Sequence, residues 1–179
     1  LRRAAEAYIR RALEAIRTMD DLPGSVYINM AASMYFIGIG DWRESENLLV
    51  ESIDISGRIG DTEKREICSL NYCYTLLFMG EATTALSKAE ELYERSDKNE
   101  SRNMCISALE ARSVCLLQLG RFEEAVEVLN LIPPLYSEEN VVFSEADQIV
   151  TYGMLALTNL RKSDLQSALA AADTALNYS

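Results

Sequence analysis

The side chains that most often carry out catalysis or bind metals are sparse in this 179-residue sequence. It contains no histidine, which removes the Ser-His-Asp and Cys-His nucleophile systems and the commonest metal ligand together. Neighbouring carboxylates occur in four pairs, Asp20-Asp21, Glu90-Glu91, Glu123-Glu124 and Glu138-Glu139. Adjacent residues on a helix point to different sides, so the members of a pair do not converge. We interpret the pairs as solvated helix faces.

Cysteines are the remaining reactive side chains. Cys68, Cys73, Cys105 and Cys115 lie in helical sequence without a C-x-x-C spacing. We expect buried thiols in a reducing compartment, which predicts a cytoplasmic protein. No calcium-loop or phosphate-loop pattern occurs, and Gly38-Ile39-Gly40 is better explained as a turn than as a phosphate cradle. The sequence therefore predicts no enzyme, no cofactor and no metal.

Charge and composition limit the partners. The formal net charge is −11 and the pI is about 4.5, so the surface would repel phosphate backbones and anionic lipids. We expect no nucleic acid and no membrane as partners, and a protein or peptide that is apolar, amphipathic or basic. No charge-free apolar run approaches the roughly 20 residues that span a bilayer. Apolar residues make up 49% of the chain, which is enough for a folded core.

The elements that position these residues are expected to be helices. The chain has only 3 prolines and 8 glycines, and its apolar residues recur at helical spacing. We expect nine helices, over 3–19, 25–38, 41–57, 62–79, 82–95, 102–119, 121–131, 144–161 and 164–177. Pro23-Gly24 should break the pattern after the first helix, and Pro133-Pro134 should begin a connection over 133–143.

A turn interrupts the helical sequence at a regular spacing. Gly40, Gly80 and Gly120 are forty residues apart, and Ser163 takes the glycine's place forty-three residues further on. Five residues after these points stand small residues, Ser45, Ala85, Ala125 and Ala168, and seven residues before them stand Ser33, Cys73, Ser113 and Ala156. Two aligned positions that hold small residues in every repeat, one on each side of the turn, predict repeated helical hairpins whose backbones approach closely. Each glycine should end its helix in a left-handed conformation.

Two helix starts carry the pattern of a capping box. Ser144 precedes Asp147 by three residues, and Ser163 precedes Gln166 by the same distance. In each case the hydroxyl and the carboxyl or amide group would satisfy free N–H groups at a helix start. We therefore expect helices to begin at both serines.

The residues around the turns resemble the tetratricopeptide repeat (TPR) family. The series Ser113, Leu116, Gly120, Phe122 and Ala125 carries the small, aliphatic, glycine, aromatic and alanine positions of that repeat. The resemblance covers nearly the whole chain and implies an all-α fold, a right-handed α-α superhelix of antiparallel helix hairpins. Here the period is forty or more, longer than the family's usual value of about 34. The family's proline after the second helix occurs only near Pro133-Pro134.

We expect the hairpins to form one array along residues 1–179. A half repeat over 1–20 should precede repeats at about 24–60, 61–100, 101–143 and 144–179. Since the sequence starts and stops within helical pattern, we expect a piece of a longer protein. Its apolar array ends would allow self-association.

The resemblance also implies a binding groove, because in that family the first helix of each hairpin lines the concave face. Transfer by register gives ten groove residues, Tyr27, Met30, Met34, Ile67, Asn71, Tyr74, Phe78, Glu110, Gln118 and Arg161. Methionine and aromatic side chains would favour an apolar or amphipathic partner. The open alternative is that some of them pack against neighbouring helices.

These observations favour a non-catalytic scaffold for protein–protein interaction. One alternative is a regulatory or sensor arm of a larger signalling ATPase, nucleotide cyclase or transcription activator, whose helical arms the long repeats resemble. Another is an enzyme of the α/α-toroid type, which needs more helices around a closed funnel than the nine expected here.

Overall fold

The computed structural model of this chain describes residues 2–137 and 144–178, and within them it contains helices and no strand. The helices are α1 (Arg2–Arg17), α2 (Leu22–Ile39), α3 (Trp42–Ile59), α4 (Thr62–Phe78), α5 (Ala82–Lys98), α6 (Arg102–Gln118), α7 (Phe122–Leu129), α8 (Ile132–Leu135), α9 (Glu145–Arg161) and α10 (Leu165–Leu176). Nine of them match the predicted helices to within three residues at either end. The all-α prediction is confirmed, and α8 is an additional single turn.

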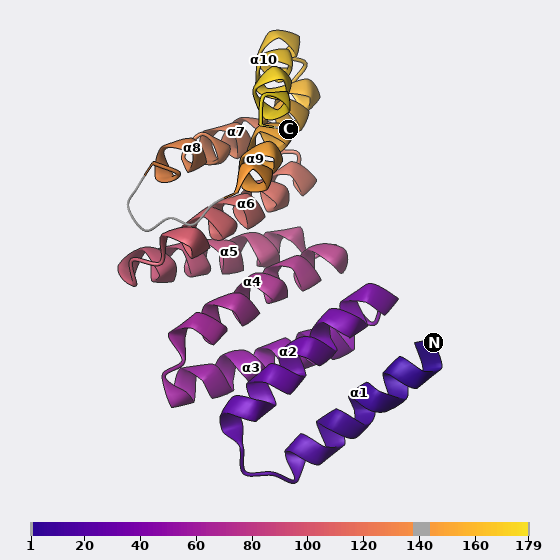
Figure 1. Cartoon of the computed structure of the whole chain (residues 1–179). Helices are drawn as coiled ribbons and strands as arrows, with labels where there is room; N and C mark the ends of the chain where they lie inside the picture. The colour runs from indigo at the N-terminus through magenta and orange to yellow at the C-terminus, as the bar shows by residue number, and fades with distance from the viewer. Residues whose placement is uncertain (1, 138–143, 179) are drawn as a thin grey trace. The chain divides into compact units, whose positions relative to one another are not determined.

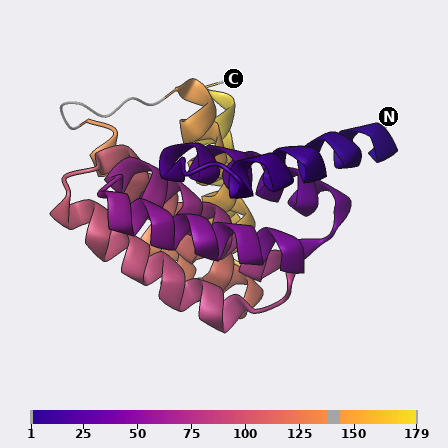
Figure 2. The same ribbon diagram turned by 90° about the horizontal axis from the view of Figure 1, so that it is seen from below.

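The chain divides into two compact units, Leu1–Gly80 and Glu81–Ser179. In the first unit each of the four helices contacts the next along the chain, and α2 also contacts α4. Both views show α1, in indigo, lying along α2 (Figure 1 and Figure 2). In the second unit α5 packs on α6, α6 on α7, and α7 on α9, which pairs with α10.

Helix α2 contributes to both core clusters of the first unit. Its Phe36 packs with Leu13 of α1 and Leu48 of α3, and its Val26 packs with Leu49 of α3 and Cys68 of α4. Burial of such apolar side chains is the main favourable contribution to folding. The helix needs an apolar residue on nearly every side because it contacts three other helices.

The composition of α2 corrects one expectation from the sequence. This helix has 18 residues without a charge and a mean hydropathy of 1.2, so by length and composition it could cross a membrane. The sequence was expected to contain no such run. In the structure 28% of this helix is buried, and Val26, Ala32 and Phe36 pack against the other helices of the first unit.

The predicted turns are confirmed by their backbone angles. Gly40, Gly80 and Gly120 have φ values of 82°, 79° and 72°, and Ser163, which replaces the glycine, has a φ of 64°. The left-handed conformation lets the next N–H reach back across the turn, as in the Schellman motif. For example, Arg121 N–H donates to the Leu116 carbonyl over 2.9 Å. The chain can therefore reverse directly after each helix.

The small residues before and after the turns lie where helices approach one another, as predicted. All are buried except Ala156, which is half-buried. Ser45 Oγ of α3 is 3.3 Å from Thr75 Oγ1 of α4, inside the first unit. A larger side chain at position 45 would have to push these two helices apart.

Some helix ends differ from prediction. The capping box of Ser144 and Asp147 is present, but the one predicted for Ser163 and Gln166 is wrong. Asp164 caps α10 by accepting from the Ser167 N–H, because Ser163 is already used for the left-handed turn. Pro23 does not break a helix either, since it lies in the first turn of α2, where its missing N–H is not needed.

The interruption at Pro133-Pro134 is confirmed but takes a different form. α7 ends at Leu129, and both prolines lie in the added turn α8, while residues 138–143 of the expected connection lie outside the described part of the chain. Tyr136, just after α8, is buried and lies 2.8 Å from Thr151 Oγ1. This hydrogen bond fixes the end of α8 to α9.

Candidate partner-binding surface

Seven of the predicted groove residues lie on α2 and α4, and together we name them the α2–α4 surface: Tyr27, Met30, Met34, Ile67, Asn71, Tyr74 and Phe78. Spacings of three, four or seven residues place each helix's members on one side of that helix. Three large side chains are more than half exposed, Tyr27 at 55%, Met34 at 54% and Phe78 at 53%. The other four are half-buried. The surface therefore combines three exposed side chains with four that are partly buried in the fold.

A cation–π contact links the two halves of this surface. The Lys64 ammonium of α4 lies 4.7 Å from the centre of the Tyr27 ring of α2. It also pairs with Asp61 Oδ2 at 2.9 Å. The hydrogen bond that Lys64 donates to Asp61, followed by its interaction with Tyr27, raises the pKa of Lys64. Lys64 thus helps to hold the Tyr27 ring in place, and more than half of that side chain stays exposed.

The α2–α4 surface continues onto Trp42 at the start of α3. The Trp42 ring stacks on Phe78, with centroids 6.5 Å apart and 21° between the ring planes. Beside it a small cleft is lined by Gly40, Asp41, Trp42, Arg43 and Met79. In the repeat, Trp42 follows Gly40 by two residues, as Phe122 follows Gly120. It was not among the predicted groove residues.

The other three predicted residues lie in the second unit. Gln118 and Arg161 are exposed. Glu110 is half-buried and accepts a hydrogen bond from Thr151 Oγ1 over 3.2 Å. Burial raises the pKa of Glu110, and the hydrogen bond from Thr151 opposes the rise. Glu110 therefore belongs to the contact between α6 and α9.

The cysteines and carboxylates form no reactive centre within residues 2–137 and 144–178. No three of the His, Cys, Asp and Glu side chains described there are grouped to hold a metal ion. All four cysteines are free and buried. Burial raises the pKa of Cys68 to about 11 and that of Cys115 to about 12. The pair Glu138-Glu139 lies outside the described residues.

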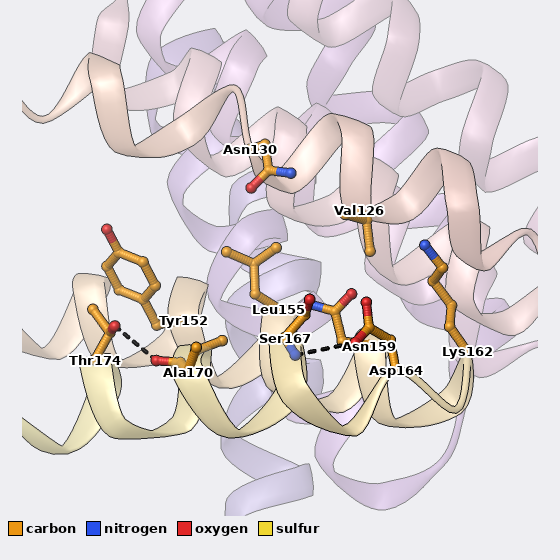
Figure 3. A pocket seen from close by; sticks show the side chains of 11 residues that line it. Val126, Asn130, Tyr152, Leu155, Asn159, Lys162, Asp164, Ser167, Ala170 and Thr174 are labelled. Atoms are coloured by element: carbon orange, nitrogen blue, oxygen red, sulfur yellow. Dashed lines mark hydrogen bonds between the residues drawn. The ribbon is translucent and has the colours of Figure 1, made fainter.

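A pocket that was not predicted from the sequence lies between α7, α9 and α10 of the second unit (Figure 3). Its volume is about 410 Å³. The lining residues are Val126, Asn130, Tyr152, Leu155, Asn159, Lys162, Asp164, Ser167, Ala170, Ala171 and Thr174. The sequence carried signs of it, since Asn159 and Lys162 stand where the other repeats have large apolar residues.

Antiparallel helices joined by left-handed turns, with small residues at the helix crossings, define an all-α helical repeat protein of the TPR-like kind. Comparison with family models and with curated protein sequences gives no match. Solved structures of TPR-like proteins do match. Because their sequence identities are low, the similarity establishes the fold alone.

Three of these structures illustrate the similarity. BtubC (BKLC) from P. vanneervenii is 17% identical with a TM-score of 0.81, and the match covers 99% of this chain and 72% of that one. A P. anserina protein described as a kinesin light chain with nearly identical TPR-like repeats is 14% identical, with a TM-score of 0.77 and coverages of 99% and 86%. A Rap protein in complex with competence and sporulation factor is 16% identical, with a TM-score of 0.79 and coverages of 96% and 47%.

Proposed function

We propose that this chain is a non-catalytic scaffold that binds a partner protein or peptide through the α2–α4 surface. The observation that carries the proposal is the exposure of Tyr27, Met34 and Phe78 on two contacting helices of one unit. Aromatic and methionine side chains offer large, adaptable contact area and are enriched where binding energy concentrates. Isolated exposed apolar residues are common on proteins, but several of them on one side of two contacting helices are a candidate interaction site.

The chemistry of the surface specifies an amphipathic partner with basic residues at its edges. Apolar side chains of the partner would cover Met34 and Phe78, while the net charge of −11 favours basic groups around them. The Rap structure was solved with competence and sporulation factor, which is consistent with a partner-binding role for this type of fold. Four buried free thiols support our further proposal that the protein acts in the cytoplasm.

Photo-crosslinking tests the proposal directly. A photoreactive phenylalanine analogue at position 34 should capture the partner in cell extract, whereas the same residue at Val50, exposed on α3, should not. The captured partner is then titrated against purified protein. Substituting Tyr27 and Phe78 together by alanine should weaken binding at least tenfold, while Val50→Ala should leave it unchanged. Equal capture from both positions, or a double variant that binds like the wild type, would refute the α2–α4 surface as the binding site.

A further inference from the structure

The fourth repeat has a polar residue at a position that belongs to the core in the first three. Four residues before each turn stand Phe36, Leu76 and Leu116, all with at most 1% of their surface exposed. The corresponding residue of the fourth repeat is Asn159, which is also buried, at 7% exposed. An asparagine in an otherwise apolar core position is a local inconsistency, and such inconsistencies are typical of functional sites.

The side-chain amide of Asn159 has no partner among the residues that the structure describes. Its side chain extends into the pocket between α9 and α7 (Figure 3). The pocket is open to solvent, so water can accept this hydrogen bond in the free protein. A ligand that accepts a hydrogen bond from this amide would take the place of that water.

A positive charge enters the same pocket through a second departure from the repeat pattern. One residue before each turn, the first three repeats have Ile39, Met79 and Leu119, whereas the fourth has Lys162. The Lys162 side chain lines the pocket, where its charge also interacts with that of Asp164. Lys162 caps the C-terminal end of α9, three residues after Asn159, and both side chains line the pocket, so both can donate to one ligand group.

Small residues of α10 leave room for a ligand. Ala171 corresponds to Leu48, Lys88 and Val128 in the earlier repeats, and Ala170 lies next to it in the lining of the pocket. Val126 of α7 and Leu155 of α9 supply apolar walls. The volume of about 410 Å³ lies at the lower end of the range for ligand sites in proteins, which suits a ligand of few atoms.

We propose that this pocket binds a single carboxylate carried on a short aliphatic group. Asn159 Nδ2 and Lys162 Nζ would donate to the carboxylate, and Val126, Leu155 and Ala171 would cover the aliphatic part. Asp164 lies at the same end of the pocket, but its carboxylate already accepts from the Ser167 N–H at 3.1 Å. Its negative charge opposes a second anionic group, so the site selects a monocarboxylate. The ligand is either a free small acid or the terminal residue of a peptide.

The first experiment compares an acid with its amide. N-acetyl-leucine and N-acetyl-leucinamide are titrated against isotopically labelled protein, and the amide signals of Asn159, Ser167 and Ala171 are followed by NMR. The acid should bind at least about tenfold more tightly than the amide, and added salt should weaken it. Equal shifts with both compounds, or no shift at millimolar acid, would overturn the proposal.

A second pair of probes identifies the source of the carboxylate. An octapeptide ending in leucine is compared with N-acetyl-leucine, each with a free terminus. Tighter binding of the peptide assigns the site to chain termini, and equal or weaker binding assigns it to small acids. Both results support the shared chemistry.

Variants separate binding from stability. Asn159→Leu restores the residue type of the earlier repeats and removes the amide donor, so it should abolish binding without lowering the Tm. Lys162→Met, which copies Met79, should weaken binding about tenfold with little change in Tm. Lys98→Met is the matched control, because Lys98 is exposed on α5 away from the pocket, and it should bind like the wild type. Retention of full affinity by either pocket variant would overturn the proposed carboxylate site. This outcome would not affect the proposal for the α2–α4 surface, which lies in the other unit.

Discussion

Trp42 stacks on Phe78, so the first residue of α3 is joined to the last residue of α4. Trp42 also lines a small cleft together with Met79, the residue that follows Phe78. Both rings remain partly exposed, and Phe78 belongs to the α2–α4 surface. Packing and binding therefore share one aromatic pair.

Removing one ring of this pair should lower the stability of the first unit. Trp42→Ala loses the stacking interaction and part of a buried surface, so we expect the free energy of unfolding to fall by about 1–2 kcal/mol. Urea denaturation followed by circular dichroism measures the change. Arg43→Ala, at the neighbouring exposed position, is the control and should change stability by less than about 0.5 kcal/mol. An unchanged midpoint for Trp42→Ala would show that the stacking contributes nothing.

The same substitution should have opposite effects at two glycines of the second unit. Gly120→Ala places a side chain at a φ of 72° with no steric neighbour, so only backbone strain is added. We expect a loss of about 1 kcal/mol. Gly153→Ala, within α9 and also without a neighbour, should increase stability by up to about 1 kcal/mol. Thermal unfolding of both variants checks the signs, and destabilisation by both would contradict the role assigned to Gly120.

The fold followed from the sequence because its determinants are local and repeated. Gly40, Gly80 and Gly120 mark helix ends by a backbone requirement that few other residues meet. The turns that connect successive hairpins were harder to predict. Gly60 and Glu100 adopt the same left-handed conformation there, with φ values of 74° and 56°. A glutamate carries no comparable sign of such a turn, so its position could not be predicted.

The candidate sites followed from the sequence only in part. Register placed Tyr27 and Phe78 on adjoining helices, because the repeat fixes which face each helix presents. It could not show that Trp42 stacks on Phe78, a contact that depends on side-chain rotamers. The pocket could not be predicted because α7, α9 and α10 together form it. Asn159, which indicates it in the sequence, stands out only after the repeats are aligned at their turns.

Stability should depend on pH through Glu110. Burial raises the pKa of this carboxyl above its ordinary value of 4.5. Between that value and the folded-state pKa, only the native state retains the proton, so the free energy of unfolding should fall as pH rises through this window. Glu110→Gln should lack this contribution and should be more stable than the wild type at neutral pH. A stability difference between the two proteins that does not change from pH 4 to pH 7 would exclude this role.

The buried cysteines should be unreactive while the protein is folded. With pKa values near 11 for Cys68 and near 12 for Cys115, less than about one thousandth of either thiol is ionised at pH 7.5. Iodoacetamide should therefore modify neither residue in the native protein and should modify both in urea, as mass spectrometry can show. A Met34→Cys variant provides an exposed thiol that should react readily in the native state. Rapid native modification of Cys68 would mean that the core of the first unit opens frequently.

Helix α10 leaves an apolar stripe uncovered, which should allow copies of this chain to associate. Leu165, Leu169 and Leu176 are exposed, with Leu169 at 64%. Their counterparts on α5 include Ala82 and Leu86, which are buried in the unit where α6 packs on α5.

Burial of this stripe between two copies would remove apolar surface from water, so we expect the wild type to dimerise with increasing concentration. Leu169→Glu should remain monomeric in analytical ultracentrifugation and should change stability by less than about 0.5 kcal/mol, because the side chain is exposed. The matched variant Val50→Glu, on α3, should dimerise like the wild type. A wild-type protein that stays monomeric at several hundred micromolar, or a Leu169→Glu variant that still dimerises, would show that α10 is not the contact.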